Sequence, residues 1–600
     1  MSTRPAISQE NPDVGEERII NNKPVYDTPE GFTLARKILA PLLPFDPHDY
    51  QIQGVCALMD GQDLVATMAT GAGKTGYFIM LMLIVCAISE DKSLALKNVK
   101  FLKDPAMIIV CPTKALQKDM SSKMAKLGLK TLVINSDTYT AAQMNNQDLW
   151  KLAQVDVTML LLSPEELRNQ GFSRLLDVQK FSNRLVFMGV DEIHLLYWWG
   201  KSFRPSFHQL GHIRACLLLR GGVRLPLVAL TATLHVGEPL ECIENTLGLV
   251  PGQYQLIRRS NVRHDIQLIF HELKSGLGGH QFPKLDWILK EDENTIIFCK
   301  TIALGFRLIC YLWNHARNLS NCDKRIQLYN SLNWPDYNTE TLAFLNNNTE
   351  SSITVATDTL SVGWDSRFTR NAVILGEPNN IDEFLQKIGR VGCDHKAVPY
   401  PQVFLYYTCS RLATAKKILA GSPTKKIRTG SRLRQTTQDN SDLNMDPSMA
   451  QLLVADCKVK AVDEPYNNPL EDPPCTCNTC ITAPPIPHPQ RCNCSGPNCE
   501  PEALDILTPT PPMRCQQTTT NQPRVPKGEG LTKELCEYAA EKFLELRWAI
   551  FLGGDGDADA MLPPDAFLPN DIIKIILDNI HLIKAVENVK TIVEHHDLLN

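Results

Sequence analysis

Short apolar runs alternate with longer mixed segments along the first two thirds of the chain. The runs at 106–111, 157–162 and 185–190 each have the length of one buried strand, and the segments between them have the length of helices. Such alternation is typical of a parallel sheet whose two faces are covered by helices. A second alternating set begins with TIIFC at 295–299. The pattern therefore predicts an α/β protein with two parallel sheets.

The stretch GQDLVATMATGAGKT at 61–75 predicts a site for phosphate groups. It joins a short β-branched run to a glycine-rich turn and the start of a helix. Glycines let backbone N–H groups crowd an anion, and the helix points its positive end toward it. Lys74 would reach the β- and γ-phosphates of ATP, and the Thr75 hydroxyl would hold Mg²⁺. The residues of the turn itself are Thr70, Gly71, Ala72 and Gly73. The alternative is a glycine turn that caps a buried helix.

Two carboxylates follow the apolar run at 185–190, namely Asp191 and Glu192. Ligands of parallel sheets bind at the carboxyl ends of the strands, so both side chains are expected beside the phosphate turn. Asp191 is placed to hold Mg²⁺, and Glu192 is placed to orient or deprotonate the attacking water. The pattern therefore predicts a P-loop NTPase.

An aromatic-rich segment, DEIHLLYWWGKSFRPSF at 191–207, resembles the acidic motif and the adjoining loop of RecQ-type DNA helicases. The match continues through Trp199, Gly200, Phe203, Arg204 and Pro205. In that family the loop senses single-stranded DNA, which implies that Trp199, Phe203 and Arg204 contact nucleic acid. Aromatic rings stack on bases and arginine binds phosphate, so the role is physically reasonable. From the residues alone, a core aromatic cluster is the alternative.

Three later features resemble motifs of the same family in the same order. RRSNVRHDI at 258–266 resembles the link between two RecA-like lobes. SITVATDTLSVGWD at 352–365 resembles the motif that joins DNA contact to ATP contact, which implies that Asp365 lies near the nucleotide. Gln51 lies ten residues before Gly61, where helicases of this kind have a glutamine that reads adenine. An ordinary surface glutamine is the alternative.

QKIGRVGCDH at 386–395 resembles the last helicase motif, in which Gln386 and Arg390 face the ATP held by the first lobe. Cys393 stands where the family has a second arginine that reaches the γ-phosphate. An arginine finger contributes ~10³ to 10⁵ in rate, or ~4 to 7 kcal/mol of barrier. Cysteine cannot supply that charge. His48 is a second departure, since an arginine is usual near the adenine-reading glutamine.

Eight of the nineteen cysteines lie between Cys457 and Cys515. Residues 1–32 are polar without an apolar signal region, so we expect no secretion, and thiols or metal ligands rather than disulfides. The resemblance to the RecQ zinc subdomain implies one structural Zn²⁺ held by Cys457, Cys475, Cys477 and Cys480. A second group, Cys492, Cys494 and Cys499, has His488 or Cys515 as a possible fourth ligand and no family pattern behind it. Free thiols in a loop are the alternative for both groups.

The remaining features concern charge and the C-terminal region. The net charge of −5 argues against uniform binding to a polyanion, but the run from Arg411 to Arg434 has eight Lys or Arg and no acidic residue. That run is a candidate DNA contact, with solvated surface as the alternative. The longest apolar run, Tyr77 to Ile88, is too short to span a bilayer. No winged-helix domain is recognisable after the cysteines, which weakens the case for strong unwinding.

The fold expected from these features is α/β, with two RecA-like parallel-sheet lobes, a small zinc-binding subdomain and a C-terminal helical module. The expected domains are a polar tail (1–32), lobe 1 (33–257), lobe 2 (258–410), a basic helical segment (411–456), a zinc-binding cysteine region (457–499), a proline-rich linker (500–530) and the helical module (531–600).

The resemblance implies an ATP-dependent 3′–5′ DNA helicase or translocase that uses ATP, Mg²⁺ and Zn²⁺. Its expected partner is DNA, as single strands and duplex junctions, with no membrane, and its expected location is the nucleus. Because of Cys393, the alternative is a nucleotide-gated DNA-binding protein that hydrolyses ATP poorly. An RNA-remodelling enzyme is a third possibility.

Overall fold

The computed structural model describes fifteen stretches of the chain. They are 24–96, 103–200, 209–221, 224–274, 276–316, 322–346, 351–360, 366–394, 397–420, 445–482, 484, 491–499, 531–553, 568 and 570–593. Within these ranges no helix has both the length and the apolar character that a membrane crossing requires.

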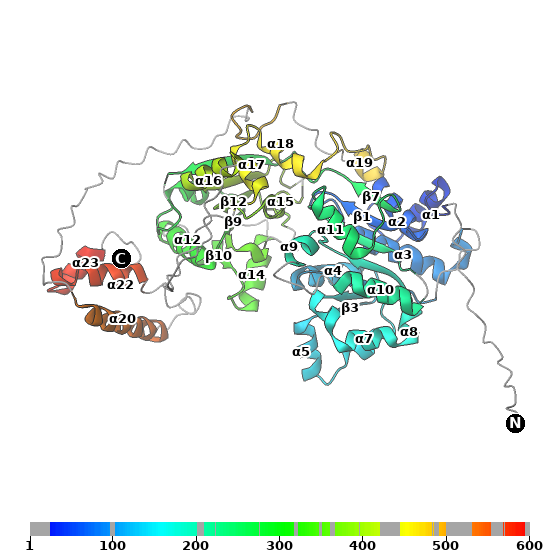
Figure 1. The fold of residues 1–600 in the computed structure, drawn as a ribbon, viewed down its shortest axis with the longest axis horizontal. Helices are drawn as coiled ribbons and strands as arrows, with labels where there is room; N and C mark the ends of the chain where they lie inside the picture. The colour runs from blue at the N-terminus through cyan, green and yellow to red at the C-terminus, as the bar shows by residue number, and fades with distance from the viewer. Residues whose placement is uncertain are drawn as a thin grey trace, which may run out of the picture.

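Lobe 1 is built on a seven-stranded sheet in the order β3-β4-β2-β5-β6-β1-β7 (Figure 1). Every neighbouring pair is parallel. The strands are β1 (Asp63–Thr67), β2 (Ala106–Val110), β3 (Thr131–Ile134), β4 (Met159–Leu162), β5 (Leu185–Val190), β6 (Leu227–Thr231) and β7 (Tyr254–Arg258). The apolar runs that predicted strands at 106–111, 157–162 and 185–190 are therefore confirmed as β2, β4 and β5.

Helices cover both faces of this sheet and enclose two apolar cores. The helices are α1 (Pro29–Leu39), α2 (Asp49–Met59), α3 (Gly76–Glu90), α4 (Lys114–Lys126), α5 (Ser136–Met144), α6 (Leu149–Ala153), α7 (Gln170–Asp177), α8 (Gln179–Ser182), α9 (Leu195–Gly200), α10 (Gln209–Gly221) and α11 (Glu238–Leu247). The long apolar run at 77–88 forms most of α3, whose residues from Tyr77 to Val85 are all buried. A helix that is apolar all round must be buried, so it cannot be a surface helix.

Lobe 2 is a six-stranded parallel sheet in the order β10-β11-β9-β12-β13-β8. Its strands are β8 (Gln267–Leu273), β9 (Thr295–Cys299), β10 (Ile326–Tyr329), β11 (Ile353–Ala356), β12 (Asn371–Leu375) and β13 (Gln402–Thr408). Its helices are α12 (Ile302–His315), α13 (Cys322–Arg325), α14 (Pro335–Leu345) and α15 (Ile381–Ile388). The two predicted RecA-like parallel-sheet lobes are confirmed.

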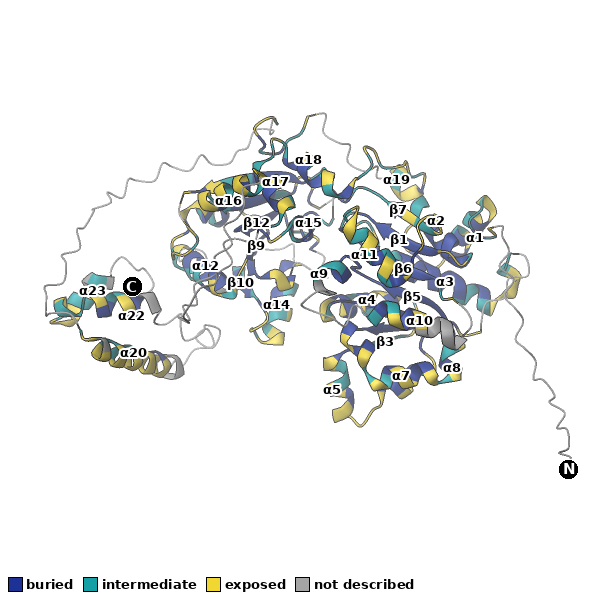
Figure 2. Ribbon diagram, viewed as in Figure 1, coloured by how far each residue is buried: buried dark blue, intermediate teal, exposed yellow. Residues whose placement is uncertain are grey.

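After the second sheet come α16 (Cys409–Leu419), α17 (Pro447–Val454) and α18 (Lys458–Asp463), which pack on lobe 2. The chain then runs across to lobe 1, where α19 (Asn478–Thr482) lies beside α2 (Figure 1). The C-terminal module contains α20 (Lys533–Gly553), α22 (Asn570–Asp578) and α23 (Val586–Val593), which share a small apolar cluster. Figure 2 shows that the strands of both lobes are buried, whereas α20 exposes much of its surface.

Candidate active site

The phosphate turn connects β1 to α3 and lies at the carboxyl edge of the lobe 1 sheet, as predicted. Gly71 and Gly73 have φ angles of +81° and +77°, which side chains with a Cβ rarely adopt. The Lys74 ammonium donates to the carbonyl oxygens of Met68 and Ala69 at 3.4 and 3.2 Å. Both glycines are exposed. The turn is therefore shaped and accessible for an anion.

Gln51 bridges the start of α2 to this turn. Its amide donates to the carbonyl oxygen of Gly73 at 3.0 Å, and its own oxygen accepts from the backbone N–H of His48 at 3.0 Å. Only 2% of the Gln51 surface is exposed. Beside it, the Tyr50 ring stacks on His48 with centroids 5.0 Å apart and faces the Arg259 guanidinium at 4.4 Å. The alternative of an ordinary surface glutamine is excluded.

The two acidic residues lie at the end of β5. Asp191 is buried and accepts a hydrogen bond from the backbone N–H of Glu192 at 2.9 Å. The φ angle of Glu192 is +50°. Burial, reinforced by the charge of Glu192 and opposed by that of Lys74, raises the pKa of Asp191 to about 7. One buried oxygen of Glu192, Oε2, has no hydrogen-bond partner among the described residues. Carboxylate and hydroxyl oxygens suit Mg²⁺, so Asp191 and Thr75 fit that ion.

A hydrogen-bonded chain beside these carboxylates leads into lobe 2 through His194, whose Nδ1 lies 3.4 Å from Glu192 Oε2. His194 Nδ1 lies 2.8 Å from the Thr231 hydroxyl, and His194 Nε2 lies 2.8 Å from the Gln386 amide nitrogen. Burial lowers the pKa of His194, so the ring is neutral near pH 7. The amide N–H can only donate, so Nε2 accepts and the ring proton sits on Nδ1, where it donates to Thr231. Predicted residue Gln386 is thus coupled directly to the acidic segment.

The end of α15 lies against the phosphate turn. The Thr70 hydroxyl donates to the Gly389 carbonyl at 3.4 Å, and a Cβ added to Gly389 would lie 2.0 Å from that hydroxyl. Arg390 is 4% exposed and its Nε donates to the Gln386 carbonyl at 3.3 Å. The Cys393 thiol donates to the Gly389 carbonyl at 3.6 Å. The predicted residues of the two lobes therefore meet at one interface.

Asp382 is a residue of this interface that the sequence analysis missed. It is buried and accepts hydrogen bonds from Trp198 at 2.6 Å, from His235 at 2.9 Å and from the Tyr466 hydroxyl. Burial alone would raise the pKa of Asp382, but hydrogen bonds from His235 and Tyr466 hold it below its usual range. Its donors come from places as distant as α9 and residue 466, so no local pattern marks it. Trp198 is an interface residue rather than a core residue.

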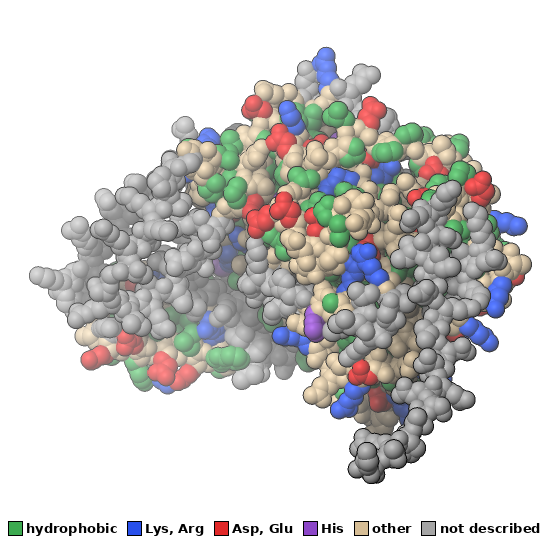
Figure 3. All heavy atoms as spheres, turned by 45° about the vertical axis from the view of Figure 1, so that its right-hand side comes forward, with side chains coloured by type: hydrophobic (Ala, Val, Ile, Leu, Met, Phe, Trp, Pro, Cys, Tyr) green, Lys and Arg blue, Asp and Glu red, His purple; other side chains and the backbone are tan. Residues whose placement is uncertain are grey.

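Some predicted contacts with nucleic acid fall outside the described part of the chain. They are the side chain of Trp199 together with Phe203 and Arg204, and, in the basic run, Lys425 and Lys426. Asp365, predicted to lie near the nucleotide, is also outside the described residues. The described part of that run forms α16, whose last turn carries Lys416 and Lys417. On the face drawn in Figure 3, basic side chains lie among acidic ones.

The cysteines form two four-ligand groups, and no disulfide joins those of the described residues. One group is Cys457, Cys492, Cys494 and Cys499, and the other is His48, Cys475, Cys477 and Cys480. Within each group the ligand atoms all lie within 4.8 Å of one another. The predicted set of Cys457, Cys475, Cys477 and Cys480 is therefore wrong, because Cys457 lies with the later cysteines. The fourth ligand suggested for those, His488 or Cys515, lies outside the described residues.

The wrong assignment of metal ligands has a physical cause. Cys457 is the N-cap residue of α18. The 492–499 turn attaches to the same part of lobe 2, where Ser495 bonds to the backbone of Leu268 and Phe270 on edge strand β8. The segment that carries Cys475 instead leaves lobe 2 and reaches lobe 1. Distances of 3.6 Å from Cys457 to Cys492 and 3.3 Å from Cys494 to Cys499 approach the ~3.8 Å between thiolates around tetrahedral zinc. Four thiolates at this spacing fit Zn²⁺.

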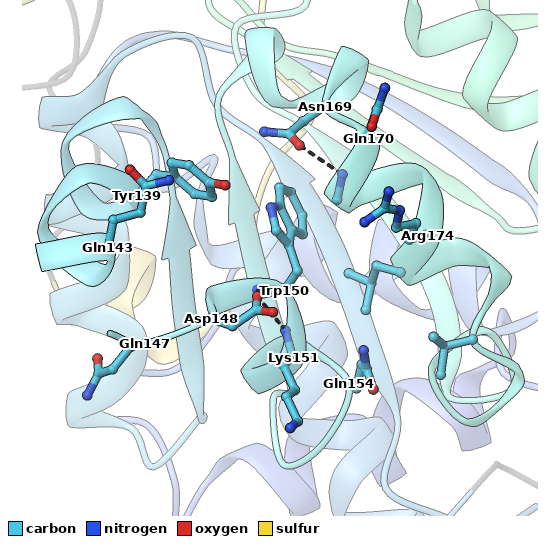
Figure 4. Close-up of a pocket in the computed structure, with 13 residues that line it drawn as sticks. Tyr139, Gln143, Gln147, Asp148, Trp150, Lys151, Gln154, Asn169, Gln170 and Arg174 are labelled. Carbon is cyan, nitrogen blue, oxygen red and sulfur yellow. Dashed lines mark hydrogen bonds between the residues drawn. The ribbon is translucent and has the colours of Figure 1, made fainter. Parts of the chain in front are cut away.

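A polar cavity of about 510 Å³ lies elsewhere on lobe 1, between α5, α6 and α7 (Figure 4). Its lining includes Gln143, Lys151 and Arg174. Trp150, another lining residue, packs against Gly171, which has no side chain to displace the ring. None of the residues predicted for nucleotide or metal binding lines it.

A known protein family matches the part of lobe 1 that carries this site. Residues 48–241, which form most of lobe 1, match the model of the DEAD/DEAH box helicase family. The range includes the phosphate turn, Gln51 and both acidic residues.

Individual helicases also resemble this chain in sequence. The chain is 24% identical over 344 residues to the ATP-dependent DNA helicase RecQ of Pasteurella multocida, covering 57% of this chain and 50% of that protein. It is 25% identical over 378 residues to the putative ATP-dependent RNA helicase R290 of Acanthamoeba polyphaga mimivirus, covering 58% and 56%. The solved DUF1998 helicase MrfA bound to DNA and AMPPNP gives 15% identity and a TM-score of 0.48, covering 62% and 50%. The chain spans about half the length of these proteins. The predicted resemblance to RecQ-type helicases is confirmed, with this chain as a divergent relative.

Proposed function

We propose that the chain is an ATP-dependent 3′–5′ DNA helicase or translocase, in which hydrolysis of ATP between the lobes changes their grip on single-stranded DNA. The observation that carries the proposal is the hydrogen-bonded chain Thr231–His194–Gln386, which joins the nucleotide side of lobe 1 to α15 of lobe 2. A change at the acidic residues would be transmitted across the interface by this chain. Nuclear residence follows only from the DNA substrate and belongs to the same proposal.

Each residue of the site has a role in this scheme. The backbone of the phosphate turn and Lys74 bind the phosphates, and Gln51 orients the base. Glu192 carries a buried oxygen that is available to hold the attacking water. Asp191 and Thr75 would hold Mg²⁺, which neutralises charge on the phosphates when bound. Arg390, at the end of α15, would face the γ-phosphate. Lobe closure would exclude water from the reaction.

Zinc is part of the proposal for Cys457, Cys492, Cys494 and Cys499. Four thiolates make a closed structural site, which would fasten the 492–499 turn to the start of α18 on lobe 2. The site has no open position for a substrate, so its contribution would be to folding.

The test is ATP turnover by the purified chain with and without single-stranded DNA, with Lys74→Ala as the control. We expect DNA to stimulate turnover and Lys74→Ala to abolish it. Stimulation of the wild type that does not exceed the control rejects the proposal. The relative named as a putative RNA helicase makes RNA the competing substrate, and competition between single-stranded DNA and RNA decides which strand is preferred.

Cys393 supports a second candidate, a DNA-binding protein that ATP gates but that hydrolyses poorly. The nearby Arg263 does not replace the missing arginine, because it donates to the Val391 and Gly392 carbonyls, both at 2.7 Å, and pairs with Asp265. Under this reading Cys393→Arg should raise turnover at least tenfold, which is a small part of the ~10³ to 10⁵ that an arginine finger contributes. No rise would remove the basis of the second candidate.

A further inference from the structure

The group formed by His48, Cys475, Cys477 and Cys480 joins two parts of the chain that are more than 400 positions apart. His48 comes directly before α2 of lobe 1. The three cysteines belong to residues 466–482, which we call the strap. The strap leaves lobe 2 and ends on lobe 1.

The ligand atoms have the spacing of a metal centre. His48 Nδ1 lies 3.3 Å from the sulfurs of Cys477 and Cys480 and 3.8 Å from that of Cys475. Around tetrahedral zinc, with Zn–S near 2.3 Å and Zn–N near 2.0–2.1 Å, nitrogen and sulfur ligands lie about 3.6 Å apart. Three thiolates and one imidazole favour Zn²⁺ over Mg²⁺ or Ca²⁺, which prefer oxygen ligands.

Backbone N–H groups point at the sulfurs, as they do around metal-bound thiolates. Asp49 donates to the Cys475 sulfur at 3.2 Å, and Cys480 donates to the Cys477 sulfur at 3.4 Å. Such outer contacts orient ligands and offset the negative charge of several thiolates. Because Asp49 belongs to lobe 1 and Cys475 to the strap, the first contact also crosses the junction.

Two carboxylates of lobe 1 hold the strap in place around the cysteines. Asp46 accepts from the backbone N–H of Asn478 at 2.8 Å, and Asp49 accepts from the Thr476 hydroxyl at 2.9 Å. Arg36 on α1 forms ion pairs with both carboxylates, Asp46 in the loop before α2 and Asp49 at the start of α2. The ligand group is thus positioned by contacts other than those between its own members.

The other end of the strap is anchored between the lobes. The Tyr466 hydroxyl donates to Asp382 of lobe 2. Farther along, Asn468 donates to Asn261 at 2.7 Å, and Asp472 pairs with Arg259 at 3.2 Å, so the strap follows the link between the lobes. Its last anchor is the group at His48.

We propose that His48, Cys475, Cys477 and Cys480 bind a zinc-class divalent ion, distinct from the ion of the Cys457 group, which fastens the strap to lobe 1. The ion sits next to the nucleotide pocket. The His48 backbone N–H donates to Gln51, and Gln51 donates to Gly73 of the phosphate turn. Metal binding therefore orders α2 and tightens nucleotide binding. This last consequence rests on the proposed function, whereas the metal site does not.

The experiment measures metal per chain by mass spectrometry on the full-length protein purified under reducing conditions. His48→Asn removes the imidazole but keeps a residue that caps helix α2 well. We expect it to lose one equivalent of zinc. His48→Cys restores a fourth soft ligand and should retain the metal. Cys536→Ser, which removes a half-buried thiol of the C-terminal module, should change nothing.

Equal metal content in His48→Asn and the wild type overturns the proposal. Cys494→Ser should remove a different equivalent, because it belongs to the other group. Hydrogen exchange locates the effect, and we expect faster exchange at 466–482 in His48→Asn but not in His48→Cys. If exchange rises in β5 and β6 as well, the variant has lost its fold. The cobalt spectrum of the wild type then decides, and a spectrum of sulfur-only coordination overturns the proposal.

The nucleotide affinity is measured separately on the same proteins. His48→Asn should weaken binding of a non-hydrolysable ATP analogue at least threefold, and His48→Cys should not. A wild type that binds zinc at His48 but no nucleotide would reject the proposed function and leave the metal site established. A wild type that binds nucleotide but holds no His48-dependent metal would reject the metal site and leave the proposed function standing.

Discussion

The imidazole of His194 and the side-chain amide of Gln386 meet at 2.8 Å across the two lobes, although 192 positions separate them in the chain. Both residues are buried, with 3% and 9% of their surfaces exposed. A buried polar group that loses its partner costs ~1 to 3 kcal/mol. The pair can therefore bias the equilibrium between closed and open lobes.

Gln386→Ala should uncouple hydrolysis from nucleic acid. It leaves His194 Nε2 without its donor only when the lobes are closed, so the substitution destabilises the closed state more than the open one. A difference of ~1.4 kcal/mol corresponds to a tenfold change. We expect nucleic-acid-stimulated turnover to fall ~10-fold, while affinity for an ATP analogue changes less than twofold. Steady-state ATPase assays and fluorescence titration measure the two quantities.

The matched control is Gln143→Ala, which removes the same group from an exposed position on α5. It should leave turnover as in the wild type. Unchanged stimulated turnover in Gln386→Ala would mean that the pair plays no part in coupling.

Gly389→Ala should prevent the phosphate turn and α15 from meeting. The added Cβ would lie 2.0 Å from the Thr70 hydroxyl and 2.8 Å from the Thr70 Cβ, closer than real Cβ contacts. We expect turnover to fall at least tenfold while the nucleotide still binds to lobe 1. Gly305→Ala is the matched control on α12, where the nearest atom would lie 3.5 Å away. Turnover equal to that of the wild type in Gly389→Ala would show that this contact is dispensable.

The parts of the fold that could be predicted are those with a local cause. Strands β2, β5 and β9 are buried throughout and therefore appear as apolar runs. Edge strand β3, by contrast, is four residues long and half-buried over most of its length, and its apolar run covers only Leu132, Val133 and Ile134. The phosphate turn was predictable because its backbone requires glycine at Gly71 and Gly73.

Long-range partners left no such signal. The spacing of cysteines suggested a metal site, but spacing cannot show that Cys457 and Cys475 go to different lobes. His48 was visible only as a departure from a family pattern, since its ligand partners lie more than 400 positions away. Asp382 likewise depends on Trp198, His235 and Tyr466, which only the folded chain brings together.

Asp63→Asn should destabilise lobe 1. Asp63, at the start of β1, is 2% exposed and pairs with both Arg214 and Arg224 at 2.5 Å. Removing one partner of a buried ion pair costs ~3 to 5 kcal/mol, because the remaining charge is left without compensation. We expect that loss in the free energy of unfolding of lobe 1, measured by urea denaturation.

Asp156→Asn serves as the comparison for this substitution. Asp156 pairs with Lys130 at the surface, with both side chains well exposed, and its φ of +60° is one that asparagine tolerates. Exposed pairs contribute ~0 to 1 kcal/mol. If both variants lose the same small amount, the Asp63 network does not stabilise the lobe.

His271 should make the stability of lobe 2 depend on pH. Its ring, on β8, lies against Tyr406 at 5.3 Å and Phe404 at 6.4 Å. Burial, with a contribution from Lys284, lowers the pKa of His271 below its usual value near 6.5. The unfolded chain therefore takes up a proton more readily than the folded chain, so stability is greatest above pH ~6.5 and falls as the pH decreases. One proton gives a slope of at most ~1.4 kcal/mol per pH unit.

His271→Phe keeps an aromatic ring in the stack and removes the titrating group. The drop in melting temperature of lobe 2 between pH 7.5 and pH ~5.5 should therefore be smaller in the variant than in the wild type. His194 titrates in the same direction but belongs to lobe 1, so its contribution is common to both proteins and cancels in the comparison. Thermal unfolding followed at several pH values measures the difference. Identical drops in the two proteins would mean that His271 takes up its proton as easily in the folded chain as in the unfolded one. Its burial against Phe404 and Tyr406 would then contribute nothing to the pH dependence of stability.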